Sequence, residues 1–468
     1  MAVMQRMKRM NRLAAGGTHS MVVTERCELY VWGSNYFGQV GNHSLEDVLR
    51  PMVIFKRNAK ECFGARWSSL MLDLDDRLWA WGYNEDGILG LGHGVEKQQI
   101  PVQVDTGGHH IRHAAGGWKH FLAVTLDGKV LAWGSNDCGQ LGDGSTQKRR
   151  QAMLTPLPNG KVAKAVAAGW YHSLVLTEDG EVLGAGIGMS TAGGSFSGAR
   201  HMGRGGPFQQ VIRTGVHAIS ASGTHSLALT KSGTVLSWGG NDHGEIGNGT
   251  LEMQPVPVAV AFDQVTIAAG VHHCMCADEE YILQVWGHGV VPADDHEIDC
   301  PARFSVLEPT EIRCGEGAFF IAAGEAHCLI GGPEGEVMAY GQNIHGQVGN
   351  GSTADAGVPQ EMMSGGTVEI VSQADRLAAA MKAPKEDYGP GKDPFGRDLY
   401  ALKDAAPLVF GPPSVKYKGH RGNSGGVPDL MRRSAGVGMQ QDLVLHLAKP
   451  AEFQLAHIRT HKSHGQLH

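Results

Sequence analysis

Long apolar runs, charged residues and aromatic rings are all scarce in this sequence of 468 residues. No run comes near the roughly 18 apolar residues that a membrane-spanning helix requires, and no secretory apolar segment is present, so we expect neither a membrane span nor export. Aromatic residues make up 7% of the chain, so a core must be built mainly from Val, Leu, Ala and Ile. The eight cysteines show no paired spacing, which is typical of reduced cysteine and favours an intracellular compartment.

Charge is also limited, because charged residues are 19% of the chain and the net charge is −7. The sequence is net acidic before residue 375 and net basic after it. An acidic body neutralises phosphates poorly, and phosphate neutralisation supplies most of non-specific nucleic-acid affinity. We therefore expect no nucleic-acid partner, except one bound through the basic C-terminal part.

Glycine, by contrast, is abundant, with 67 residues that fall at regular places. Residues 114–146 read AAGGWKHFLAVTLDGKVLAWGSNDCGQLGDGST. Two short apolar runs flank Asp127-Gly128, and Asp-Gly between such runs is a strong hairpin signal, because a type I′ turn needs positive φ at both central residues. This stretch therefore predicts two adjacent strands followed by a glycine-rich loop.

The same pattern returns along the chain with a period of about 50 residues, which indicates a repeat architecture. One landmark is the histidine of a G-x-x-H step, for which Trp67 stands in the second copy: His19, Trp67, His120, His172, His225, His273 and His327. The other is the aromatic residue of a W-G step, with two substitutes: Trp32, Trp81, Trp133, Ala185, Trp238, Trp286 and Tyr340. The two series keep step to within one residue, so we count seven repeats.

Each repeat predicts about four short strands: one at A-A-G-x-x-H-S-L, one after the D-G turn, and weaker ones flanking a proline-containing stretch, as at Pro51 to Phe55 or Pro255 to Val260. A four-stranded antiparallel sheet with two apolar faces cannot bury itself alone, whereas sheets packed radially around an axis bury both faces. We therefore predict an all-β fold, a seven-bladed β-propeller, with the small A-A-G residues nearest the axis and a mostly irregular C-terminal extension.

The succession G-x-x-H-S, D-G, W-G-x-N and G-Q-L-G-x-G resembles the RCC1 repeat, named for the regulator of chromosome condensation. The resemblance covers residues 13 to about 365. Each motif is weak alone, but seven copies in register are specific. Kelch repeats have a similar period, yet their double glycine and spaced aromatics do not recur here.

The predicted organisation has four parts. Residues 1–12 are a basic lead, 13–365 the propeller, 366–380 a decayed repeat half or a short helix, and 381–468 an extended tail rich in Gly, Pro and Lys with one helix at most. The second, fourth and sixth copies depart from the pattern. Loops vary at little cost to the core, so such departures are where partner contacts are expected.

Two of the departing loops carry charge. The loop of the fourth repeat offers Arg200, His201 and Arg204 to an acidic partner, and that of the sixth offers Asp294, Asp295 and Glu297 to a basic one. Neither loop has the G-K-[ST] ending of a phosphate cradle. Solvated loops remain the alternative reading of both.

Trp118 and Trp170 hold the same position in adjacent repeats, within G-W-K-H and G-W-Y-H. They are similar to the G-W-R-H-T tryptophan cluster of the plant ultraviolet photoreceptor, an RCC1-like propeller, but only two are apparent and no arginine stands between them. A partner surface, or simple packing, is the reading we favour.

The recurring histidines predict a hydrogen bond inside each blade and no metal. His273, Cys274 and Cys276 do not make a site either, because alternate residues of a strand face opposite ways while zinc needs convergent ligands. Neither a nucleophile–base pair nor a cofactor loop stands out, so we expect no cofactor and no catalysis.

We predict a non-enzymatic protein-interaction scaffold in a large intracellular assembly, ciliary or ribonucleoprotein, with other proteins of that complex as partners. The resemblance implies one alternative, a guanine-nucleotide exchange factor for a Ran-like small GTPase. Because the first repeat begins by Leu13, we expect no cleaved leader and a cytoplasmic location, with cilium or cytoskeleton as the refinement and mitochondrion or nucleus left open.

Overall fold

The computed structural model describes residues 12–92, 95–187, 206–289, 305–312, 317–333 and 335–363. The chain divides into two units, Met1–Asp404 and Ala405–His468, and every described residue belongs to the first. The basic lead before residue 12, the stretch 366–380 and the tail 381–468 lie outside the described residues. Within the described part, no helix has the length and apolar character needed to cross a bilayer.

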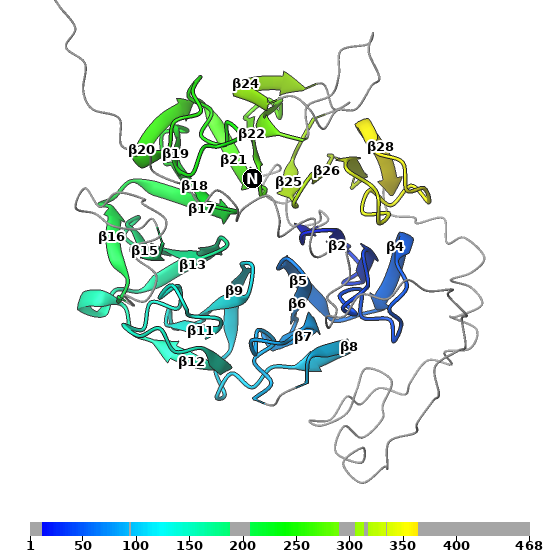
Figure 1. The fold of residues 1–468 in the computed structure, drawn as a ribbon, viewed down its shortest axis with the longest axis horizontal. Helices are drawn as coiled ribbons and strands as arrows, with labels where there is room; N and C mark the ends of the chain where they lie inside the picture. The colour runs from blue at the N-terminus through cyan, green and yellow to red at the C-terminus, as the bar shows by residue number, and fades with distance from the viewer. Residues whose placement is uncertain are drawn as a thin grey trace, which may run out of the picture. The chain divides into compact units, whose positions relative to one another are not determined.

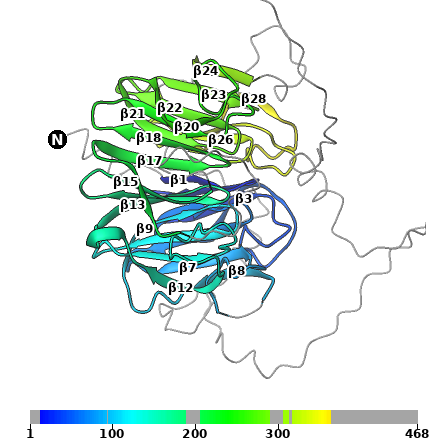
Figure 2. The ribbon, with the colours of Figure 1, turned by 60° about the vertical axis from the view of Figure 1, so that its left-hand side comes forward.

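The described residues form seven four-stranded antiparallel sheets set around a central axis, which confirms the predicted seven-bladed β-propeller (Figure 1). The first strand of each sheet lies nearest the axis and the fourth lies at the rim. Figure 2 shows the inner strands of successive blades stacked beside one another. Each blade comes from one continuous stretch of chain, so the ring closes without a strand exchanged between its first and last blades.

The first four blades contain sixteen strands and the single described 3-10 turn, η1 (Pro158–Gly160). Their bounds are β1 (Arg12–Ala15), β2 (His19–Val23), β3 (Leu29–Gly33), β4 (Val48–Phe55), β5 (Ala59–Gly64), β6 (Ser68–Asp73), β7 (Leu78–Tyr83), β8 (Lys97–Gln103), β9 (Ile111–Gly116), β10 (His120–Thr125), β11 (Val130–Gly134), β12 (Arg149–Thr155), β13 (Ala163–Ala168), β14 (His172–Thr177), β15 (Val182–Gly186) and β16 (Gln209–Ile212).

The last three blades contain twelve strands. Their bounds are β17 (Val216–Ser222), β18 (His225–Thr230), β19 (Val235–Gly239), β20 (Gln254–Ala261), β21 (Gln264–Ala269), β22 (His273–Asp278), β23 (Leu283–His288), β24 (Ser305–Ile312), β25 (Phe320–Ala323), β26 (His327–Gly331), β27 (Val337–Gly341) and β28 (Ala356–Met363).

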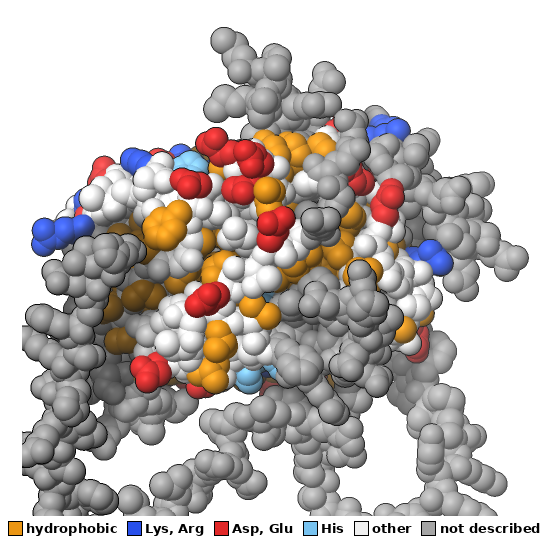
Figure 3. All heavy atoms as spheres, turned by 90° about the horizontal axis from the view of Figure 1, so that it is seen from above, with side chains coloured by type: hydrophobic (Ala, Val, Ile, Leu, Met, Phe, Trp, Pro, Cys, Tyr) orange, Lys and Arg blue, Asp and Glu red, His pale blue; other side chains and the backbone are white. Residues whose placement is uncertain are grey.

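Local sequence explains the order of the strands. The second strand of each blade is buried along almost its whole length between neighbouring sheets. Proline is kept to the rim, where the missing N–H breaks no ladder bond: Pro51, Pro101, Pro255, Pro309 and Pro359 all lie in fourth strands. The exposed edges of these five sheets are thereby protected from pairing with another chain. On the rim seen in Figure 3, apolar and acidic side chains lie side by side.

The antiparallel order gives the ring two different ends. The turn between the first and second strands and the loop between the third and fourth open at one end, which we call the G-x-x-H end. The D-G hairpins between the second and third strands open at the other, the D-G end. The W-G glycine is required at the first of these, because all seven copies have φ between +96° (Gly287) and +115° (Gly239), and a Cβ on Gly134 would lie 2.4 Å from the Lys119 carbonyl oxygen.

A hydrogen-bonded clamp joins neighbouring blades at the G-x-x-H end. The backbone carbonyl of a loop residue in one blade accepts the indole N–H of the next blade's W-G tryptophan. Trp32 donates to Gln347 at 2.9 Å, which closes the ring, Trp81 donates to Gln39 at 2.7 Å, and Trp133 donates to Ile88 at 2.7 Å. In several blades a serine hydroxyl donates to the same carbonyl, as Ser20 does to Gln347 at 2.8 Å.

The G-x-x-H histidines belong to this clamp, and the prediction that each bonds within its own blade was wrong. His120 Nε2 lies 2.8 Å from Ser173 Oγ of the next blade, and His327 Nε2 lies 2.9 Å from Ser20 Oγ across the closure. Because these serine hydroxyls donate to a carbonyl, each can only accept from the histidine, which places the proton on Nε2.

The second blade places its landmark one residue later than the sequence suggested. Ser68, not Trp67, pairs with the W-G glycine, as His19 does in the first blade. The Ser68 side chain is too short to bond to the third blade as a histidine does. In the third blade, Phe121 stands in place of the serine that accepts the histidine N–H in other blades. The lost donor and the lost acceptor therefore meet at one interface, so neither change leaves the other's hydrogen-bonding group unpaired.

The clamp predicts different costs for two similar substitutions. Both Trp32 and Trp238 are fully buried, but the Trp238 indole N–H has no hydrogen-bond partner among the described residues. Trp32→Phe should lower the free energy of unfolding by about 1–2 kcal/mol more than Trp238→Phe, because among the described residues only the former breaks a buried hydrogen bond. Urea unfolding followed by circular dichroism measures both variants, and equal losses would contradict the clamp.

The buried histidines predict a dependence of stability on pH. Burial lowers the pKa of His120 to about 4 and that of His172 to about 3, against 6.5 in the unfolded chain. Between these values the unfolded chain binds more protons, so stability is lost as pH falls from about 6.5 towards 4, by up to about 1.4 kcal/mol per pH unit for each histidine. His120→Asn should flatten the fall in urea midpoint between pH 7 and pH 5, and an unchanged slope would refute this origin.

Candidate functional site

The most distinctive surface lies at the G-x-x-H end, where two turn residues per blade surround the axis. Backbone hydrogen bonds link these turns from blade to blade: Gly17 donates to Arg66 at 3.0 Å, Trp118 to Gly169 at 3.2 Å, and Glu325 to Gly17 at 3.0 Å. Among the described residues, such bonds join the turns at every seam but that between the fifth and sixth blades, so the turns form a belt around the axis. The side chains of the belt differ between blades although its backbone is repeated.

Arg66 is the centre of this belt. Its guanidinium carbon lies 4.8 Å from the ring centroid of Trp67, 5.0 Å from that of Trp118 and 5.7 Å from that of Trp170. The side chain is only 8% exposed. A desolvated guanidinium against an aromatic face is worth up to about 2 kcal/mol, so three such faces hold this charge firmly in place.

An acid from a distant blade completes the charge balance. Arg66 Nη2 lies 3.0 Å from Glu325 Oε1 of the seventh blade, across the turn of the first blade. Gly17 makes this possible, since a Cβ there would lie 3.0 Å from Arg66 Cγ and 3.2 Å from Glu325 Oε2. The ion pair leaves the surface with aromatic faces and little net charge.

The three tryptophans belong to a longer arc of ring contacts that runs over several blades. Trp118 lies 5.3 Å from Trp170 and 6.4 Å from Trp67, measured between ring centroids. All three are partly exposed. Successive contacts extend the arc at both ends, through Tyr36, Phe37, Tyr83, Tyr171, His272 and His243.

Charged side chains flank the arc at the second and third blades. Lys119 lies 2.9 Å from Asp86, Lys148 lies 3.3 Å from it, and the Lys119 ammonium stands over the Tyr83 ring at 5.7 Å. Burial alone would raise the pKa of Asp86, but hydrogen bonds from the two lysines lower it below its usual value. At neutral pH the Asp86 carboxylate is therefore ionised and bonded to the two lysine ammonium groups.

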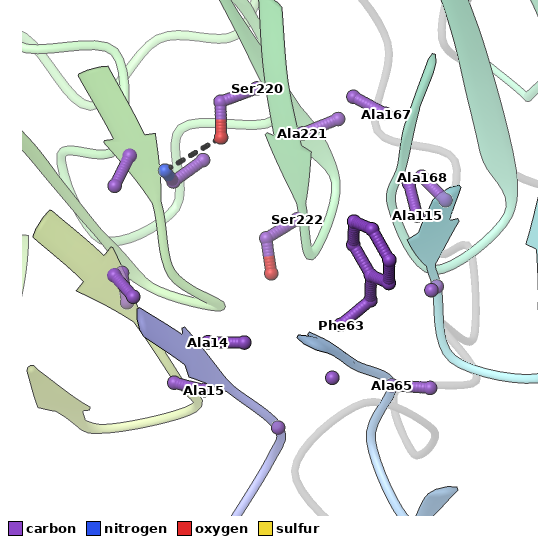
Figure 4. Close-up of a pocket in the computed structure, with 18 of the residues that line it drawn as sticks. Ala14, Ala15, Phe63, Ala65, Ala115, Ala167, Ala168, Ser220, Ala221 and Ser222 are labelled. Atoms are coloured by element: carbon purple, nitrogen blue, oxygen red, sulfur yellow. Dashed lines mark hydrogen bonds between the residues drawn. The ribbon is translucent and has the colours of Figure 1, made fainter. Parts of the chain in front are cut away.

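Behind the belt, the inner strands enclose an axial cavity of about 280 Å³ (Figure 4). Small side chains line it, as predicted for the A-A-G strands, among them Ala15, Ala168 and Ala221, and Phe63 projects into it. Ser220 Oγ accepts a hydrogen bond from the Ala269 amide at 3.0 Å, so the hydroxyl is engaged with the neighbouring blade. Most lining residues are apolar and small, and this cavity offers few groups that would orient a ligand.

Of the candidate residues named from sequence, Trp118 and Trp170 come together at the belt. The reading that only two tryptophans gather there, without an arginine, was wrong, because Trp67 and Arg66 join them. Taking Trp67 as the histidine position concealed both residues, and counting back from Ser68 would have found them. The other candidates, Arg200, His201, Arg204, Asp294, Asp295 and Glu297, lie outside the described residues.

The chain was compared with known proteins. Residues 68–383 match the model of the RCC1-like domain, and residues 12–39 match the regulator of chromosome condensation (RCC1) repeat. The Arabidopsis thaliana ultraviolet-B receptor UVR8 is 26% identical over 365 residues, which are 74% of this chain and 80% of the receptor. The Mus musculus secretion-regulating guanine nucleotide exchange factor is 27% identical over 373 residues, 73% of this chain and 79% of that protein.

The E3 ubiquitin-protein ligase HERC2 of Homo sapiens is 28% identical over 357 residues, which are 73% of this chain. The chain spans only 7% of the length of that ligase and of its mouse counterpart. Similarity to HERC2 therefore concerns the repeat region alone.

Solved structures share the fold. Yeast RCC1 (Prp20), in its complex with Kap60, superposes with a TM-score of 0.63 at 21% identity, covering 81% of this chain and 94% of that one. Human WBSCR16 gives a TM-score of 0.62 at 20% identity, covering 72% and 95%. The RCC1-like domain model matches well over half of the sequence, and the described residues between 12 and 363 fold into a seven-bladed ring, so the chain belongs to the RCC1-like domain family.

Proposed function

We propose that this protein is a non-enzymatic interaction module that binds a protein partner through the aromatic arc at its G-x-x-H end, within a larger intracellular assembly. The observation that carries the proposal is the group of partly exposed tryptophans held around Arg66. Protein interfaces are enriched in tryptophan, tyrosine and arginine, and these residues dominate measured hot spots. The arc offers all three on a rigid support, so little entropy is lost on binding.

The charge distribution favours a protein over a nucleic acid. Aromatic platforms also bind single strands, but such sites add a positively charged groove for the backbone. Here Arg66 is neutralised by Glu325, and Lys119 and Lys148 both meet Asp86. The arc itself is thus mainly aromatic, and the charge at its centre is neutralised, which suits a protein surface. Its placement in a cytoplasmic, ciliary or ribonucleoprotein assembly remains a prediction from sequence.

The interaction predicts a difference between the two ends of the ring. The Trp118→Ala/Trp170→Ala double variant should weaken partner binding by at least about 2 kcal/mol, or some thirtyfold, since buried aromatic anchors carry most interface energy. The matched control is Phe262→Ala. This ring lies at the D-G end between β20 and β21 and is 62% exposed. Quantitative mass spectrometry of proteins cross-linked to the full chain in cells measures both variants.

Partners lost with the double variant and kept with Phe262→Ala would support the proposal. The urea midpoint of each variant must first be shown to lie well above working conditions. If the wild type and both variants retained the same partners equally, a role of the arc would be refuted. If the double variant and Phe262→Ala lost them equally, the contact would lie elsewhere.

Exchange on a small GTPase is the second candidate, because one relative is named a guanine nucleotide exchange factor and aligns over 79% of its own length. A structural neighbour, yeast Prp20p, was studied for binding to Gsp1p and histones. Partner proteins of these kinds fit the same proposal, with a GTPase as the occupant of one face.

A nucleotide-release assay separates the two candidates. With the full chain added to a panel of small GTPases loaded with fluorescent GDP, we expect release rates to stay within about twofold of the intrinsic rate. The arginine at the centre of the arc is already engaged by Glu325 and therefore does not offer its guanidinium to a phosphate or a phosphate-binding loop. Acceleration by orders of magnitude with any member would establish exchange instead.

A further inference from the structure

One loop of the ring carries a charge where its counterparts are neutral. In the first, third and seventh blades, the glutamine of G-Q-x-G accepts the N–H of the residue two positions earlier, as Gln39 does from Phe37 at 2.9 Å. In the fifth blade Glu245 does the same for the His243 amide at 2.9 Å. Glu245 is 2% exposed. A buried carboxylate is costly unless a cation or strong donors meet it, so its presence calls for a partner that an amide does not need.

The second carboxylate oxygen faces histidine. Glu245 Oε1 lies 3.3 Å from His272 Nδ1, and the His272 and His243 rings lie 4.5 Å apart between centroids. His272 occupies the turn position that holds Thr224 in the preceding blade and Ala326 in the following one. The three donor groups therefore come from two blades, and their ligand atoms all lie within 4.8 Å of one another.

The backbone beneath this cluster is held rigidly. The Glu245 carbonyl accepts the Trp286 indole N–H at 2.8 Å and the Cys274 thiol at 3.3 Å, both from the sixth blade. Asn241 Oδ1 accepts the Ile246 amide at 2.9 Å and fixes the loop around the acid. A third imidazole, that of His288, lies 5.4 Å from His243 between ring centroids. These bonds fix the backbone that carries Glu245, so the carboxylate is held in place while the two imidazoles can adjust to a ligand.

We propose that His243, Glu245 and His272 bind a divalent transition-metal ion, with zinc as the natural fit, at the seam between the fifth and sixth blades. Two imidazoles and one carboxylate form a common zinc donor set, and such sites leave a fourth position to water or an incoming group. Donor atoms of a tetrahedral zinc site lie about 3.3 Å apart, given bonds of about 2.0 Å. The ligand atoms now lie within 4.8 Å of one another, and rotation of the half-buried His243 and His272 side chains brings them to this shorter distance.

The seventh blade supplies an internal control. Its loop places His345 where the fifth blade has His243, but Gln347 and, on the adjoining first blade, Thr18 stand in the positions of Glu245 and His272. His345 bonds to Asp47 at 2.8 Å, so one imidazole and an exposed-loop carboxylate remain where the fifth blade gathers two imidazoles and a buried carboxylate. The two loops have the same backbone hydrogen bonds, so a difference in zinc binding between them can be attributed to the donor side chains.

The test is calorimetric titration of the full chain, stripped with EDTA, with ZnCl₂ as the probe. Glu245→Gln installs the amide that other blades use and keeps the bond to the His243 N–H, so the fold is preserved. His272→Thr restores the residue of the preceding blade. We expect each variant to bind one zinc equivalent fewer, or to bind it more than about 100-fold more weakly, since even second-shell losses cost 10–100-fold. His345→Asn should bind as the wild type does.

Cobalt substitution provides a second readout, because a tetrahedral Co²⁺ site absorbs strongly in the visible range. That band should be present in the wild type and in His345→Asn, and absent in Glu245→Gln. Histidines elsewhere in the chain would contribute equally to every variant. An unchanged stoichiometry and affinity in Glu245→Gln, an equal loss in His345→Asn, or no binding by the wild type would each overturn the proposal.

Discussion

The ring depends on one interaction, the acceptance by a loop carbonyl of hydrogen bonds from the next blade. Among the described residues no strand is shared between blades, so no sheet ladder joins the seventh blade to the first. Trp32 and Ser20 both donate to the Gln347 carbonyl at this seam. Because the acceptor is backbone, the side chain at that position is free to vary, and Ile88 and Glu245 serve as well as glutamine. This explains how a degenerate second repeat, which reads GILGLG where others read GQLG, still packs as a normal blade.

The departures from the repeat are therefore not equivalent. Where Ser68 removes a histidine, Phe121 removes its acceptor, and the interface becomes apolar at no cost in unpaired groups. Glu245 is a departure of the opposite kind, because it adds a buried charge to a loop that an amide satisfies elsewhere. A compensated change points to packing, whereas an added charge beside two histidines points to a ligand. The same comparison sets Arg66 apart, since it occupies a turn position that is glycine in the first and fifth blades.

The architecture could be predicted from the sequence because the same local sequence features recur from blade to blade in a propeller. The D-G turns, the W-G glycines and the prolines of the rim strands each mark a local backbone requirement, and local requirements repeat. The functional surface could not be predicted in the same way. Arg66 and Glu325 lie 259 positions apart in the chain, and His243 meets His272 only because the fifth and sixth blades adjoin. The histidine bonds were misassigned for the same reason, since a pattern fixed within each repeat does not reveal that its partner lies in the next.

This separation of scaffold from surface has a physical consequence for recognition. The belt of backbone bonds at the G-x-x-H end fixes where each turn points, whatever its side chains are. The residues there differ from blade to blade, with tryptophan, arginine and histidine among them, while the clamp beneath them recurs. The charge at the centre of the arc is neutralised, because Arg66 pairs with Glu325, so long-range attraction by this group is weak. Recognition at this end must then rest on the shape and burial of the aromatic arc, which favours a partner that presents a complementary apolar surface over one that presents charge alone.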